Sequence, residues 1–132
     1  MTSVRALAVE VLVRVERDRA FAAPLLAAKE TGLAPRDRPL LRTIVRTVLR
    51  NRSLLDHVLS RSLSRPLDGL DPDVRAALRA GAAQLLLLDR IPAHAAVGET
   101  VEVVRVRSPR ASGLVNAVLR RVASGERPPR VV

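Results

Sequence analysis

The side chains that could transfer protons or bind a metal are few and scattered along this sequence. It contains two histidines and no cysteine. His94 lies between Asp89 and Glu99, shortly after four consecutive leucines. A histidine beside carboxylates can act as a general base, but a lone histidine next to a proline at a helix start is typical of packing or capping. Because no metal-ligand spacing, phosphate loop or nucleophile motif is present, we predict no catalytic residue, no metal site and no cofactor.

Arginine is the residue type whose number and spacing suggest a function. The chain of 132 residues has 23 lysines and arginines against 13 aspartates and glutamates, which gives a formal net charge of +10. A field this positive favours a polyanionic partner, usually RNA or DNA. Four arginines recur at four-residue steps: Arg38, Arg42, Arg46 and Arg50.

This arginine stripe would place like charges side by side on a helix, where they repel each other. No acid lies between Asp37 and Asp56 to relieve the repulsion. A second acid-free segment, Val103 to Gly125, carries further candidates in Arg110, Arg120 and Arg121. Segregated charge of this kind predicts contact with phosphates. The alternative is a solvated helix face in an arginine-rich protein.

The aromatic content narrows the kind of nucleic-acid binding. Phe21 is the only aromatic residue of the chain. Platforms that stack bases need several rings, so an OB-fold or RRM-like surface is disfavoured. Binding would therefore depend on arginines, backbone groups and helix ends.

The elements that must position these side chains are predicted to be helices, because apolar residues recur at three- and four-residue steps almost throughout. Ser3, Ser53 and Asp71 are N-cap candidates, and Gly81 lies where another helix could approach closely. The expected fold is all-α, a compact bundle of about six to seven helices over residues 1–124, followed by a flexible tail or linker at 125–132. The expected helices cover about 4–17, 22–30, 35–50, 54–63, 72 to before Pro92, 93–105 and 114–122.

Length and composition also indicate the cellular compartment of the protein. No apolar run approaches the ~20 residues of a membrane span, and no signal-peptide pattern opens the chain. The absence of cysteine fits a reducing environment. We therefore expect a cytoplasmic protein with no membrane association.

Three segments carry a family resemblance: RDRPLLRTIVRTVLR, RPLDGLDPDVRAALRAGAAQLLLLDRIPAHAAVGETVEVV and GLVNAVLRRV. In order and spacing they resemble the NusB-like helical RNA-binding fold, and more closely the N-terminal domain of the small-subunit ribosomal RNA cytosine-5 methyltransferase B family (Sun/Fmu/RsmB). The resemblance spans about Ser3 to Val122. NusB proper is more distant, since its last helix usually carries an acid where Arg120-Arg121 stand here. Thr47, Gly98 and Thr100 also depart from the methyltransferase pattern.

The resemblance implies a non-catalytic domain that holds ribosomal RNA for a catalytic methyltransferase domain in the same or another chain. Cytosine-5 methylation needs a cysteine thiolate and an S-adenosylmethionine pocket on an α/β sheet, and the sequence has neither. Gln84, His94 and Asn116 would be structural polar residues. The predicted RNA contacts are Arg5, Arg36, Arg38, Arg42, Arg46, Arg50, Arg110, Arg120 and Arg121.

Other functions remain open at this point. A NusB-type transcription antitermination factor would act through RNA and ribosomal protein S10. A protein-interaction domain could dock on a catalytic partner through an apolar groove. A DNA-binding helical domain is disfavoured, because no helix-turn-helix spacing is evident.

Overall fold

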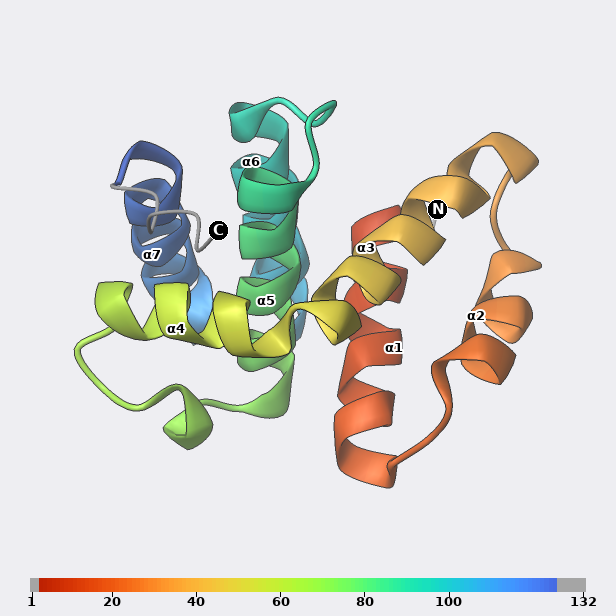
Figure 1. The fold of residues 1–132 in the computed structure, drawn as a ribbon, viewed down its shortest axis with the longest axis horizontal. Coiled ribbons are helices and arrows are strands. Elements are labelled where there is room, and N and C mark those ends of the chain that lie inside the picture. The colour runs from red at the N-terminus through yellow and green to blue at the C-terminus, as the bar shows by residue number, and fades with distance from the viewer. Residues whose placement is uncertain (1–2, 126–132) are drawn as a thin grey trace.

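The computed structural model describes residues 3–125, and this part of the chain is helical with no β-strand (Figure 1). The all-α prediction is confirmed. The tail expected at 125–132 lies outside the described residues, apart from Gly125. The helices are α1 Val4–Asp18, α2 Ala22–Glu30, α3 Arg38–Arg50, α4 Arg52–Ser62, α5 Pro72–Leu87, α6 Ala93–Arg107 and α7 Ser112–Ser124.

Helix α5 is the central element of the bundle. It packs against α1, α3, α4, α6 and α7. Its middle, Ala76 to Gln84, is buried on every side, which the alanines and Gly81 allow because short side chains let neighbouring helices approach. A Cβ atom built on Gly81 would lie 2.5 Å from Cδ1 of Leu119 on α7. The close helix approach predicted at this glycine is therefore confirmed.

Helices α3 and α4 follow each other across one side of the molecule, where α3 crosses α1 and α4 crosses α5 (Figure 1). Their inner faces carry aliphatic residues, and Leu41, Ile44 and Leu55 are fully buried. Burial of each such side chain contributes roughly 1.5–3 kcal/mol, so the two helices are held mainly by these contacts. Their outer faces are left to polar and charged residues.

Most of the predicted helix boundaries agree with the structure to within a few residues. Ser3 caps α1, since its Oγ accepts a hydrogen bond from the backbone nitrogen of Ala6 at 2.9 Å. Asp71 is the N-cap of α5, although its side chain makes no capping hydrogen bond.

The start of α4 was predicted wrongly. Ser53 was expected as its N-cap, but α4 already begins at Arg52 with Asn51 as the cap residue. Asn51 closes α3 through its backbone nitrogen to the Val48 carbonyl at 3.2 Å, and its own carbonyl accepts from Leu55 at 2.9 Å. Asn51 is thus the C-cap of α3 and the N-cap of α4, so a single residue joins the two helices.

Within residues 3–125, no helix has the length and apolar character that crossing a membrane requires.

Candidate nucleic-acid interface

The arginine stripe of α3 divides into two halves. Arg38 donates from Nε to the Glu30 backbone carbonyl at 2.9 Å, and Arg42 donates from Nε to Glu30 Oε1 at 2.5 Å. Arg46 and Arg50 are exposed, and among residues 3–125 they have no ion-pair or hydrogen-bonding partner for their side chains. The first half therefore joins α3 to the end of α2, although 40% of the Arg42 side chain stays exposed, whereas the second half faces solvent without a partner.

Helix geometry explains the division. Four residues advance an α-helix by slightly more than one turn, so each step rotates the side chain by roughly 40° about the axis. From Arg38 to Arg50 the stripe turns by roughly 120°. The side chains of Arg38 and Arg42 therefore point toward Glu30 at the end of α2. Those of Arg46 and Arg50 point into solvent.

The remaining predicted contacts on the α3 and α7 sides are exposed. Arg36 lies in a short 3₁₀ turn before α3, and Arg110 in a similar turn before α7. Arg120 donates from Nε to Asn116 Oδ1 at 3.3 Å. Arg121 donates from Nη1 to the Ser62 carbonyl at 2.9 Å, which links α7 to the end of α4. In the described part of the chain, none of these four arginines has a carboxylate partner.

Arg5 is placed differently from the other predicted contacts. Only 13% of its side chain is exposed, and it forms an ion pair with Glu99 on α6. Its Nε donates to Oε1 of the fully buried Gln84 at 2.7 Å. Gln84 in turn donates from Nε2 to the Ala80 carbonyl at 3.0 Å and to Thr100 Oγ1 at 3.4 Å. The guanidinium of Arg5 thus ties α1 to α5 and α6.

The two other residues expected to be structural lie at the surface. His94 is exposed in the first turn of α6, and Asn116 is half-buried on α7. Both line a surface hollow of ≈310 Å³ between these helices, together with Arg120 and the exposed Gly98. The structure brings His94, Asn116 and Arg120 together, but neither Asp89 nor Glu99 lines the hollow with them.

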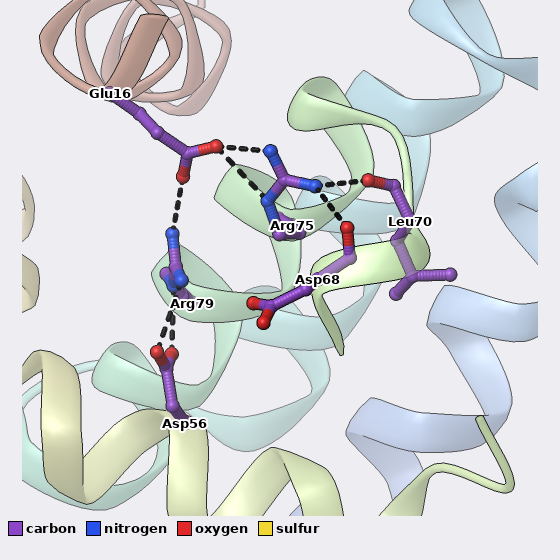
Figure 2. A network of polar contacts seen from close by, with 6 residues as sticks. All are labelled: Glu16, Asp56, Asp68, Leu70, Arg75 and Arg79. Carbon is purple, nitrogen blue, oxygen red and sulfur yellow. Dashed lines mark hydrogen bonds and ion pairs between the residues drawn. The ribbon is translucent and has the colours of Figure 1, made fainter. Parts of the chain in front are cut away.

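A network of charged residues joins α1, α4 and α5 and was not predicted from the sequence (Figure 2). Arg79, whose side chain is 7% exposed, donates to both carboxylate oxygens of Asp56 at 2.8 and 3.0 Å. Its Nη1 donates to Glu16 Oε2 at 2.7 Å. Arg75 binds the other oxygen of Glu16, and it also donates to the backbone carbonyls of Asp68 and Leu70.

This network fixes the ionisation of its members. Burial alone would raise the pKa of Glu16, but hydrogen bonds from Arg75 and Arg79 outweigh it and hold that pKa below its usual value. Burial alone would lower the pKa of Arg79, yet hydrogen bonds from Asp56 and Glu16 raise it. In the sequence, Arg79 lies among the apolar residues of α5. A charged residue in such a segment was the one sequence signal of an internal ion pair.

Pairing separates the arginines into two classes. Many are neutralised by a nearby carboxylate, including the half-buried Arg14 and the exposed Arg17, Arg105 and Arg107. In the described part of the chain, groups of three or more residues able to hold a metal ion are absent. The exposed arginines that lack a carboxylate partner are thus the strongest candidates for binding a ligand, and the ligand they favour is an anion.

The sequence matches the NusB family model over residues 2–124. Relatives named "Ribosomal RNA small subunit methyltransferase B" are 46% identical in Thermus thermophilus, over 94% of this chain and 31% of that protein, and 46% identical in Xanthomonas campestris, over 80% of this chain and 24% of that protein. The chain therefore spans about a quarter to a third of these relatives.

Solved structures agree on the fold. A Thermotoga maritima NusB structure superimposes with a TM-score of 0.84 at 24% identity, covering 97% of this chain and 96% of that one. The NusB of a complex with NusE and double-stranded RNA superimposes with a TM-score of 0.82 at 24% identity, covering 91% of this chain and 92% of that one. From its sequence match and its bundle of helices around α5, this chain belongs to the NusB family.

Proposed function

We propose that this chain is the RNA-targeting, non-catalytic domain of a small-subunit ribosomal RNA methyltransferase. Its partners are ribosomal RNA and a catalytic domain in the same or another chain, and it works in the cytoplasm. The relatives at 46% identity carry the name of that methyltransferase, and the chain matches only a minor part of their length. Cytosine-5 methylation needs a cysteine nucleophile, and this chain has no cysteine.

The observation that carries the proposal is the set of exposed arginines without carboxylate partners. On an ordinary surface the acids would be interleaved with the bases, whereas here several of the acids, including Glu16, Glu30 and Asp56, are engaged in ion pairs with other arginines. The phosphate contacts that we propose first are Arg46 and Arg50. The exposed Arg36, Arg110, Arg120 and Arg121 are proposed as further contacts. Arg38, Arg42 and Arg5 belong to the predicted set as well, but their inward contacts favour a supporting role.

The direct test is the salt dependence of RNA binding. The chain is titrated with a small-subunit ribosomal RNA fragment at several salt concentrations. Each neutralised phosphate releases counterions, so the logarithm of affinity should fall with the logarithm of salt with a slope of several units. Binding that is undetectable, or that does not respond to salt, would contradict the proposal.

The residues are tested with charge-matched variants. We expect R46E/R50E to weaken RNA binding strongly. The control R14E/R105E changes the charge by the same amount at two arginines that already have carboxylate partners. Equal losses in the two variants would mean that net charge alone, and not the outer face of α3, governs binding.

The second candidate is NusB-type antitermination with ribosomal protein S10. Its support is the structural likeness to the NusB that was solved with NusE and RNA, at 24% identity. That likeness extends to the fold only, whereas the methyltransferase relatives are almost twice as similar in sequence. Binding of purified S10 to this chain, measured by calorimetry, would favour antitermination, and its absence would favour the methyltransferase.

A further inference from the structure

The outer face of α4 has the chemistry of a phosphate-binding surface. Leu55, Val58 and Leu59 face the core, and the opposite side of the helix is exposed. The only acid of α4, Asp56, is held by Arg79 through both of its oxygens. The exposed positions, apart from Arg52 in the first turn, are Ser53, Leu54, His57, Ser60 and Arg61.

A hollow lies beside this face, at the C-terminal end of α4. It has a volume of ≈260 Å³ and is formed by α4, the end of α5 and α7. Apolar side chains of Val58, Leu86 and Val122 line it together with Arg61, Ser62 and Arg121. The volume is below that of a typical pocket for a drug-sized molecule and is sufficient for a phosphate group with part of its sugar.

The two arginines of the hollow have most of their donors free. A guanidinium carries five N–H groups. Arg121 uses one to bind the Ser62 carbonyl at 2.9 Å, a contact that fixes it at the hollow's wall. Arg61 has no side-chain partner within residues 3–125. The helix-end carbonyls nearby carry only partial negative charge, so within residues 3–125 these two full positive charges have no counter-charge.

The exposed part of α3 precedes the outer face of α4 along the chain. Arg46 and Arg50 lie on the exposed part of α3, directly before α4 in the chain, and the two helices run along the same side of the molecule (Figure 1). From Arg46 to Arg61 the chain advances by roughly 22 Å along the axes of the two successive helices. The exposed positions of this stretch carry no carboxylate. An extended polyanion therefore fits the surface better than an isolated ion does.

We propose that RNA backbone lies along the outer face of α4, and that Arg61 and Arg121 clamp one of its phosphates in the hollow. This inference rests on the proposed function and adds a site to it. Arginines bind phosphate through paired N–H groups, and serine hydroxyls such as those of Ser53 and Ser60 donate to phosphate oxygens. With the imidazole of His57 as its only exposed ring, the face recognises backbone and not base sequence.

The test is the double variant R61Q/R121Q in the full chain, with R14Q/R105Q as the control of equal charge. We expect the double variant to bind the ribosomal RNA fragment about tenfold more weakly at low salt. Its salt slope should fall by about 0.7–0.9, the value for one phosphate. The loss should be the same for RNAs of different sequence, since a backbone contact carries no sequence information.

The outcomes separate this inference from the function itself. If the wild-type chain binds RNA with a steep salt slope and R61Q/R121Q binds like the control, the clamp is refuted while RNA targeting stands. If the wild-type chain binds no RNA, both fail. Because loss of the Arg121–Ser62 contact could reduce stability, R61Q alone is measured as well, with its urea midpoint. R61Q must weaken RNA binding without lowering that midpoint.

A crosslinking map gives an independent readout. RNA crosslinked to the wild-type chain should label peptides from residues 52–65 and 112–125. Crosslinks confined to other helices would overturn the proposal. An acidic peptide, titrated as a competitor, should fail to displace the RNA at matched charge. Displacement at equal concentration would indicate a protein ligand instead.

Discussion

Arg42 donates a hydrogen bond from Nε to Oε1 of Glu30 over 2.5 Å, and a longer one from Nη2 to Oε2 over 3.4 Å. Glu30 is the last residue of α2, and only 17% of its side chain is exposed. The contact therefore fastens the short helix α2 onto α3 and takes Arg42 out of the set of free cations. Arg46, one step further along the same stripe, has no such partner among the described residues.

We expect Arg42 and Arg46 to differ in their contribution to stability. Arg42→Ala should lower the free energy of unfolding by up to about 1 kcal/mol, because it leaves the carboxylate of Glu30 without its partner. Arg46→Ala should leave it unchanged. Urea denaturation followed by circular dichroism measures both. Equal effects in the two variants would show that the Arg42–Glu30 contact contributes nothing.

Removal of Arg79 should be the most damaging single change among the arginines. Arg79→Ala leaves Asp56 without its ion-pair partner and Glu16 with Arg75 alone, and breaking a buried ion pair in this way costs up to about 3–5 kcal/mol. A domain of this size is stable by about 5–15 kcal/mol, so the variant should unfold at much lower urea. Arg105→Ala, at an exposed pair, is the control and should change little. A mild effect of Arg79→Ala would mean that water replaces the lost contacts.

The Glu16 carboxylate should make the protein less stable in acid. Its pKa is lowered in the folded state by Arg75 and Arg79, so the unfolded chain binds the proton more readily. Its contribution is complete above the unfolded pKa of about 4.3, and it is lost as the pH falls through the lower folded value. Urea unfolding at a series of pH values should show stability falling below about pH 4, and less steeply in Glu16→Gln. Identical slopes in the two proteins would exclude Glu16 as the cause.

Two glycines inside helices should respond to alanine in opposite directions. At Gly98 a Cβ meets nothing within 4 Å, and the better helix propensity of alanine should stabilise the protein by about 0.5–1 kcal/mol. At Gly81 a Cβ would lie 2.5 and 2.8 Å from the two methyl groups of the buried Leu119. We expect Gly81→Ala to destabilise by about 1–3 kcal/mol, since the packed core cannot move freely. Thermal unfolding of both variants checks the contrast, which an equal shift in the same direction would refute.

The position of the helices was predictable because helix formation depends on near neighbours. Apolar residues three and four apart form the inner face, and proline and glycine mark the ends, so the segments around α2, α5 and α6 could be assigned without knowledge of the fold. The start of α4 was missed, because Ser53 and Asn51 are both acceptable cap residues. The choice between them depends on how sharply the chain turns from α3 into α4, which crosses α5.

The roles of the arginines were only partly predictable. A stripe such as Arg38 to Arg50 shows that like charges lie together on a helix, but it does not show which of them meet an acid from another helix. Arg5 contacts a glutamine 79 residues away along the chain, and Arg79 contacts Glu16 at a separation of 63. Such pairs form only when packing brings distant segments together.

By itself, therefore, the sequence determined the helical architecture, the excess of positive charge and the absence of a thiol nucleophile, because these follow from local periodicity and composition. Only the tertiary structure decided which guanidinium groups are neutralised inside the bundle and which remain in solvent, and it alone revealed the hollow beside Arg61 and Arg121. The physical reason is that a side chain's charge is set by the sequence, whereas the partner that compensates it is set by the packing of helices far apart in the chain.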